Sequence, residues 1–169
     1  MRAILVSTGG EPITQFQVPA SAGTYTLSVS VARDEPWTRR ATRVDATWTF
    51  RSGHVNGDQP QSLPLMVVRA RPDTDPYDWS PAGRRVRFPV WVERVSGAAA
   101  TSIKDLALDI SCDDGVTWLP AGLHPDHDRW LATISHPDGG PGFVSLRGRA
   151  TDTAGSTVAQ TVVRAYALR

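Results

Sequence analysis

The sequence predicts an all-β protein built as a β-sandwich, and three observations lead to that prediction. Apolar and polar residues alternate along several short segments, as they do in strands that bury one face. Clusters of Gly, Pro, Asp and Ser separate these segments, as expected of the turns between strands. No stretch shows the apolar period of 3.6 residues that is typical of a helix. With 169 residues, of which 40% are hydrophobic, the chain is large enough for a packed core.

The first fifty residues predict two hairpins. The third and fourth segments alternate most clearly, with Tyr25, Leu27 and Val29 on one face of the third. Four strands alone bury little, so we expect residues 1–50 to form a partial β-sandwich. Residues 51–63 are polar and rich in turn formers, which predicts a linker. The expected strands are residues 3–7, 13–18, 24–32 and 42–50.

The rest of the chain, residues 64–169, predicts a seven-stranded immunoglobulin-like or fibronectin-III-like β-sandwich. The number of short strands and their spacing are those of such domains. Pro89 falls within the second of them, which predicts an edge strand or a bulge there because proline has no N–H to donate. The expected strands are residues 64–71, 84–94, 103–112, 116–120, 128–135, 143–151 and 157–168.

The strands before the linker are expected to leave unpaired edges. Such edges are a liability, because they offer free backbone N–H and C=O groups to other chains. We expect the N-terminal hairpins either to dock on the C-terminal sandwich or to pair with another copy of the chain.

A tight turn in the C-terminal part matches the Asp-box pattern Ser-x-Asp-x-Gly-x-Thr-Trp. In this pattern the Asp accepts N–H bonds within the turn of a hairpin, and the Trp packs beneath it, which is a structural role. The preceding Cys112 shares parity with the apolar residues of its strand, so we expect it to be buried and inert. The Asp-box residues are Ser111, Asp113, Gly115, Thr117 and Trp118.

Composition and charge exclude several classes of partner. The formal net charge is +1, without a basic field for nucleic acid or an anionic membrane. No apolar run is long enough to span a bilayer, and no signal peptide begins this chain. A single cysteine rules out an intramolecular disulfide.

Two loops contain weak candidates for metal ligands. Asp73, Asp75 and Asp78 are close enough in sequence to offer oxygen ligands to calcium, but aspartates in loops more often accept their own backbone N–H groups. His124 and His127 have a spacing that can bracket a metal, yet no third or fourth ligand is evident. We therefore expect no cofactor, with calcium as the alternative.

Aromatic residues provide the only candidate binding surface. Tyr77, Trp79 and Trp91 are expected to face outward, where they would form a platform for sugar rings or for a protein. The alternative is structural: Trp79 would fold its loop over the sandwich, and Trp91 would pack against the N-terminal half.

The sequence contains no recognisable catalytic machinery. Neither a nucleophile elbow nor a phosphate-binding glycine loop is present, and the acidic pairs lie in turns. A sialidase-like glycosidase would need several Asp boxes and an arginine triad, so one box is weak support for it.

Several segments, in this order, resemble the C-terminal non-catalytic region of secreted subtilisin-like serine peptidases of the S8 family from actinobacteria such as Streptomyces. The resemblance extends from about residue 25 to the end. The segments that carry it are residues 46–52 (ATWTFRS), 63–65 (LPL), 111–118, 142–152 (GFVSLRGRATD) and 160–168 (QTVVRAYAL).

The resemblance implies an extracellular accessory module that is not itself an enzyme. No triad motif of that family has a match here, so no catalytic residue is carried over. The module would support the catalytic domain of the same or a neighbouring chain, or engage substrate or a surface. Such chains continue far beyond this N-terminus, so the sequence is either a fragment or an orphaned module. The alternative is a free-standing extracellular module that binds carbohydrate or protein.

Overall fold

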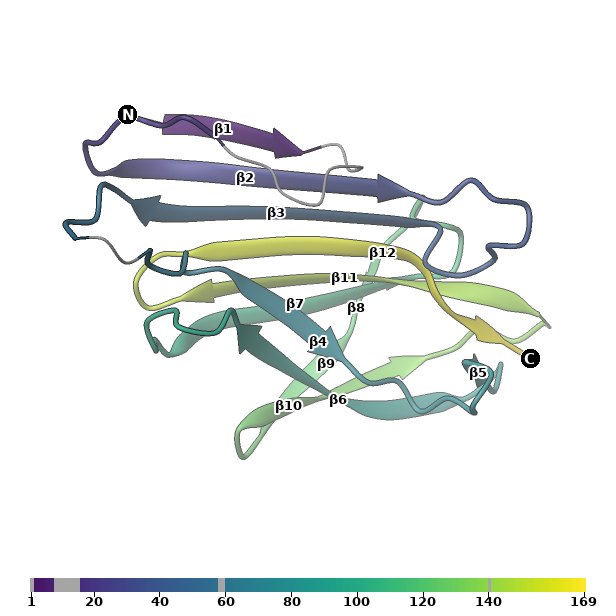
Figure 1. The fold of residues 1–169 in the computed structure, drawn as a ribbon. Helices are drawn as coiled ribbons and strands as arrows, with labels where there is room; N and C mark the ends of the chain where they lie inside the picture. Colours follow the sequence, from purple (N-terminus) through teal and green to yellow (C-terminus); the bar gives the residue numbers. More distant parts are fainter. Residues whose placement is uncertain (1, 8–15, 58–59, 140) are drawn as a thin grey trace.

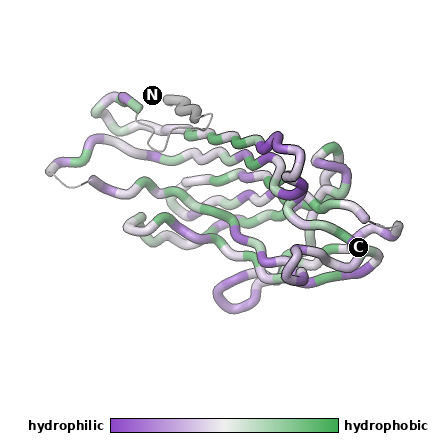
Figure 2. Tube along the Cα trace, turned by 45° about the vertical axis from the view of Figure 1, so that its right-hand side comes forward, coloured by the Kyte–Doolittle hydropathy of each residue, from purple (hydrophilic) through white to green (hydrophobic). Residues whose placement is uncertain are grey.

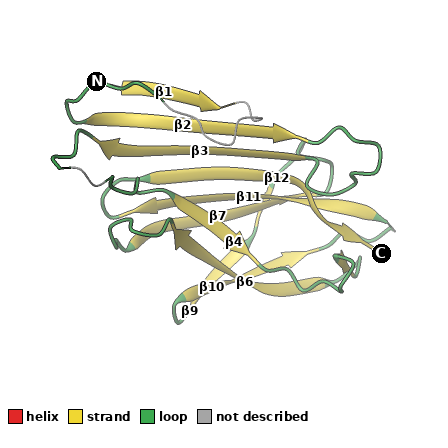
Figure 3. Ribbon diagram, viewed as in Figure 1, coloured by secondary structure: helices red, strands yellow, loops and turns green. Residues whose placement is uncertain are grey.

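A computed structural model describes the chain except for residues 1, 8–15, 58–59 and 140, and except for the side chains of residues 2–7. The described residues form two sheets of mainly antiparallel strands and no helix, so the predicted all-β sandwich is confirmed (Figures 1 and 3). The strands are β1 (Arg2–Ser7), β2 (Gly23–Ala32), β3 (Arg43–Ser52), β4 (Met66–Ala70), β5 (Trp79–Ser80), β6 (Arg85–Arg94), β7 (Ile103–Ser111), β8 (Leu119–Pro120), β9 (Gly122–Asp126), β10 (Arg129–Ser135), β11 (Gly142–Asp152) and β12 (Thr157–Leu168).

The small sheet has the order β4-β6-β10-β9, and the large sheet has the order β1-β2-β3-β12-β11-β7-β8, with β5 pairing β12 at its end. From β4 onward, this distribution of strands between two sheets is the one found in immunoglobulin-like sandwiches. The immunoglobulin-like assignment itself stays a prediction. The short strands β5 and β9 are not among the predicted ones. The predicted strand 13–18 lies partly outside the described residues, and its described residues 16–18 are irregular. Its expected hairpin partner, β1, instead pairs with β2 in parallel, so of the two predicted hairpins the structure shows the one formed by β2 and β3.

The N-terminal hairpin continues the large sheet. β2 pairs with β3, and β3 pairs with β12 from Thr157↔Thr49 to Val163↔Arg43. The expected docking on the C-terminal sandwich therefore occurs edge to edge, through backbone hydrogen bonds. The division of the chain into two domains, residues 1–50 and 64–169, stays a prediction.

The core lies between the two sheets. Inward positions of facing strands are almost fully buried, as the alternation of the sequence predicts. Figure 2 shows hydrophobic stretches along the strands and hydrophilic residues in several connecting loops. Gly148 on β11 lies so close to β4 that an added Cβ would meet the Val68 side chain at 2.8 Å. The core residues are Met66, Val68, Phe88, Val90, Leu108, Ile110, Ala132, Ile134, Val144, Ala150, Val158, Tyr166 and Leu168.

Pro89 does not lie in an edge strand or a bulge, contrary to the expectation. β6 runs between β4 and β10 with unbroken register. The proline is tolerated because β4 ends at Ala70, just where the missing N–H would have pointed. Between Arg71 and Pro89 there is therefore one backbone hydrogen bond, which the Arg71 N–H donates to the Pro89 carbonyl at 3.0 Å.

Two polar side chains of the large sheet satisfy the free edge of β4. The Gln160 amide donates to the Val68 carbonyl at 2.7 Å and accepts the Val68 N–H at 2.9 Å. The Trp48 indole N–H donates to the Met66 carbonyl at 2.6 Å. These side chains take the place of a neighbouring strand and so protect the edge.

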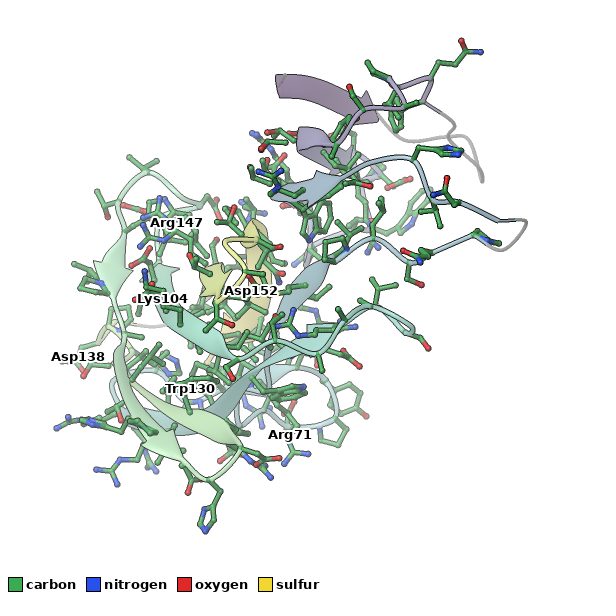
Figure 4. All side chains as sticks on the ribbon, turned by 90° about the vertical axis from the view of Figure 1, so that its left-hand side faces the viewer. Arg71, Lys104, Trp130, Asp138, Arg147 and Asp152 are labelled. Atoms are coloured by element: carbon green, nitrogen blue, oxygen red, sulfur yellow. The ribbon has the colours of Figure 1, made fainter. Side chains whose placement is uncertain are left out.

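A buried carboxylate closes the opposite end of the sandwich, at the turn between β11 and β12. Asp152 is 1% exposed and accepts bonds from Thr101 at 2.6 Å and from the Ser156 N–H at 2.8 Å, with Arg94 at 3.3 Å. Burial by itself raises the pKa of Asp152, but these hydrogen bonds and the Arg94 charge outweigh it and lower the pKa below the ordinary value. Figure 4 shows Asp152 in the interior of this end of the molecule.

Candidate functional site

Two loops that are distant in sequence meet at the end of the large sheet and form a groove of about 210 Å³. One loop joins β2 to β3, and the other precedes and includes β5. Both lie against the C-terminal part of β12. The residues that line the groove are Trp37, Arg39, Arg40, Trp79, Phe143 and Ala167.

The β2–β3 loop is held in place by backbone bonds. The Ala41 N–H donates to the Arg164 carbonyl at 2.9 Å, and the Thr42 N–H donates to the Val163 carbonyl at 3.2 Å. A turn within the loop is closed by the bond from the Thr38 N–H to the Glu35 carbonyl, 2.9 Å. The loop is thus anchored at its base while its tip stays in solvent.

The second loop is organised by Asp75. Its carboxylate accepts the backbone N–H groups of Tyr77 at 2.8 Å and Trp79 at 3.0 Å, and it pairs with Arg169 at 2.8 Å. The bond from the Trp79 N–H contributes most to lowering the pKa of Asp75 below its ordinary value. Trp79 then pairs with Ala167 of β12 in a short parallel ladder, which fixes its indole as one wall of the groove.

The arginines of the groove differ in their partners. Arg40 donates to the Tyr77 carbonyl and lies 3.6 Å from the Asp78 carboxylate, so its charge is partly neutralised and it ties the two loops together. Arg39 is exposed, and no carboxylate of the described residues lies within 4.0 Å of its guanidinium. The groove therefore has one cation available to a ligand.

A bulge in β12 supports the floor of the groove. Arg164 has a φ of 57°, in the left-handed region that non-glycine residues seldom occupy. Its guanidinium binds Asp114 through two bonds of 2.8 and 2.6 Å and lies 4.7 Å from the centre of the Phe143 ring. The strained residue is thus held from several sides, as strain in a native fold requires.

The predicted aromatic platform is only partly assembled. Tyr77 is 72% exposed beside the groove, and Trp79 lines it. Trp91 lies on the outer face of β6, opposite Arg69 of β4, and does not line the groove. The other aromatic residues that line the groove are Trp37 and Phe143, and Trp37 is 79% exposed. The sequence contains one indication of the role of Trp37, because it is a lone tryptophan in the polar segment 33–42. It contains no indication that Phe143 would line the same groove.

The predicted Asp box has the expected hydrogen bonds. Asp113 accepts the N–H of Thr117 at 2.9 Å and its hydroxyl at 2.5 Å, and the Ser111 hydroxyl accepts the Gly115 N–H at 2.8 Å. The Thr117 hydroxyl contributes most to lowering the pKa of Asp113 to about 2. The Trp118 indole donates to the Gly115 carbonyl at 2.9 Å, so the turn is closed on itself.

Cys112 is exposed, so the expectation that it is buried is wrong. β7 ends at Ser111, where the chain turns so that the Ser111 hydroxyl can bind the turn, and the alternation stops there. Partial desolvation of the sulfur, and then the Asp113 carboxylate, raise the pKa of Cys112. Its thiol is therefore not activated as a nucleophile.

The candidate metal ligands are not gathered into a site. Asp75 and Asp78 are engaged by the contacts above, and the Asp73 carbonyl accepts the Ser80 hydroxyl at 3.1 Å. His124 lies on β9, and His127 lies in the adjoining turn against Asp126. Within the described part of the chain, no three His, Cys, Asp or Glu side chains form a group that could hold a metal ion.

Comparison with known proteins gives no family. Neither a scan against protein-family models nor a search among curated proteins finds a match. The described residues also contain no helix that is long and apolar enough to cross a membrane.

Proposed function

We propose that this chain is a non-catalytic accessory module of a secreted subtilisin-like serine peptidase. In this role it supports the catalytic domain by docking against it. The observation that carries the proposal is an apolar face on β2 and β3 that continues beyond the edge of the small sheet. The sequence resemblance supplies the identity of the partner.

The apolar face belongs to the same side of the large sheet as the core. β3 pairs with β12 in register, so Trp48 lies beside the buried Val158, and Leu27 lies beside Trp48. The edge strand of the small sheet lies against β12 and β11, which leaves the hairpin outside the sandwich (Figure 1). The face of the hairpin consists of Tyr25, Leu27, Val29, Val31, Val44, Ala46, Trp48 and Phe50.

The two ends of this hairpin face differ in exposure. Tyr25 and Phe50 are buried, and they border an apolar hollow of about 240 Å³ together with Phe16, Val18 and Leu63. At the other end Val31 is 41% exposed. Apolar surface of this kind, next to a packed core, is typical of a surface that another protein covers.

The first test is the intact mass of the native protein, detected with an antibody in the culture supernatant of the source cells. We expect a species several times larger than the 169-residue chain, since the module would be the tail of a peptidase. A secreted or intracellular species of the size of the chain alone would contradict this proposal.

A second test places a charge on the hairpin face within that larger protein. Val31→Asp is expected to shorten the half-life of peptidase activity at elevated temperature several-fold, because a buried unpaired carboxylate opposes docking. The matched control is Val116→Asp, at a valine that is 81% exposed in the Asp-box turn. Equal half-lives for the two variants would contradict docking through this face.

The alternative function is a free-standing extracellular module that binds carbohydrate or protein. The exposed aromatic residues of the groove favour it, and it becomes the better proposal if the secreted species is the short chain.

A further inference from the structure

We propose that the groove between the β2–β3 loop and β5 is a binding site for an acidic polysaccharide, that is, for sugar rings that carry carboxylate or sulfate groups. This inference does not depend on docking to a peptidase, because the groove lies on different residues from the hairpin face. Its residues are Trp37, Arg39, Arg40, Trp79, Phe143 and Ala167.

The exposure of Trp37 points to a ligand. An indole that is 79% exposed leaves most of its apolar surface in water and adds little to the stability of the fold. Trp37 shares the groove with Trp79, whose position is fixed by Asp75 and by the ladder with β12. Two indoles on opposing loops provide the flat apolar surfaces against which the C–H faces of sugar rings stack.

The charges of the groove select an anionic ligand. The charged residues that line it are both arginines, and Arg40 is largely occupied by Tyr77 and Asp78. Arg39 is the cation left to pair with a carboxylate or a sulfate, and a guanidinium binds such groups through two parallel hydrogen bonds. Asp34 and Glu35 belong to the same loop but do not line the groove.

The groove is preorganised, which lowers the entropic cost of binding. The base of one loop is bonded to Val163 and Arg164, and the other loop is bonded to the end of β12. Arg40 joins the two loops directly. A ligand therefore meets walls whose backbone is already in place, and only the side chains of Trp37 and Arg39 have to be ordered.

Affinity electrophoresis of the purified 169-residue chain tests the proposal. The gels contain dextran sulfate, polygalacturonate or neutral dextran, so that sulfate, carboxylate and uncharged chains are compared. We expect retardation by at least one of the two anionic polymers and none by neutral dextran. Trp37→Ala and Arg39→Gln should each weaken the retention about tenfold, as loss of a central contact does.

The control variant is Arg87→Gln, which removes an equal charge from an exposed position on β6. It should change retention less than twofold, and circular dichroism should show all variants folded, since each altered side chain is exposed. Equal losses in Arg39→Gln and Arg87→Gln would show binding by net charge alone and overturn the proposal. Retention unchanged in Trp37→Ala, equal retention by neutral dextran, or no retention by either anionic polymer would overturn it too.

Acrylamide quenching of tryptophan fluorescence, compared between the natural chain and Trp37→Ala, distinguishes a polysaccharide from a peptide ligand. The chain has six tryptophans, so the signal of Trp37 is the part of the quenching that Trp37→Ala removes. The bound anionic polymer should reduce this part, and Arg39→Gln should need about tenfold more polymer for the same protection. Protection by a proline-rich peptide, with none by either anionic polymer, would assign the groove to a protein partner instead and overturn the proposal.

Discussion

His136 is a buried polar residue, 5% exposed, with a partner for each ring nitrogen. Its Nδ1 lies 2.7 Å from the Pro81 carbonyl, which can only accept, so Nδ1 carries the hydrogen. Its Nε2 lies 2.8 Å from the Tyr166 hydroxyl, which then donates to it. Desolvation lowers the pKa of His136 below its ordinary value of 6.5, because a protonated ring would be buried, and it outweighs the bond to the Pro81 carbonyl, which raises the pKa.

This arrangement predicts that acid destabilises the protein. A base whose pKa is lower in the folded state binds more protons in the unfolded state, so acid favours unfolding. The contribution of neutral His136 to the free energy of unfolding is therefore complete above the ordinary pKa and is lost as the pH falls below it. We expect the free energy of unfolding in urea to decrease from about pH 7 to about pH 5, with a slope of at most about 1.4 kcal/mol per pH unit from this residue.

The histidine can be separated from other titrating groups by substitution. His136→Phe should be less stable at every pH, since the Tyr166 hydroxyl loses its acceptor, but should lack most of the pH dependence. His124→Gln, at an exposed position, should keep the slope of the natural protein. An unchanged slope in His136→Phe would refute the assignment of this dependence to His136.

At the scale of an element, the Asp-box turn shows how a short motif fixes its own geometry. The carboxylate and hydroxyl of Asp113 and Ser111 satisfy backbone N–H groups within eight residues of chain. Gly115 is required because its φ of 92° is in the left-handed region, and an added Cβ would lie 3.3 Å from the Trp118 ring. The motif was therefore predictable from sequence in full. Its contact from Asp114 to Arg164, fifty residues away, was not.

Asp113→Ala is expected to loosen this turn without unfolding the sandwich. The Thr117 amide loses its acceptor, so its hydrogen exchange at neutral pH should be on the order of tenfold faster. In the natural protein the same bonds should weaken only as pH falls through the Asp113 pKa of about 2, because the lowered pKa keeps the carboxylate ionised above that value. Amide exchange by NMR measures the first effect.

The control for this turn is Asp128→Ala, whose side chain is 82% exposed and pairs with Arg129. Exchange at Thr117 should be unaffected by it. Unchanged exchange in Asp113→Ala would show that the carboxylate is not what holds the turn.

At the scale of the whole molecule, the large sheet extends past the small one, and the exposed edge of β4 is closed by side chains. Gln160→Leu would leave the Val68 N–H and C=O without partners, which should cost about 1–3 kcal/mol of unfolding free energy. The open edge should also promote self-association, seen as a concentration-dependent mass by light scattering. Thr161→Ala, at the next residue of β12, is the control and should have the same mass as the natural chain at each concentration.

The sequence by itself determined the long strands of the sandwich and the Asp box, because alternation and turn chemistry are local properties that neighbouring residues impose. It missed the short strands β5 and β9 and the exposure of Cys112, because these depend on pairing and on the exact point where a strand ends. Leu108 and Val144 are buried, as the alternation of their strands predicts. Only the tertiary structure decided that β3 pairs with β12, that Gln160 closes the edge of β4, and that Trp37 meets Trp79 across a groove. Each of these contacts joins residues more than thirty positions apart, and their meeting depends on how whole strands pair and pack, which no local pattern records.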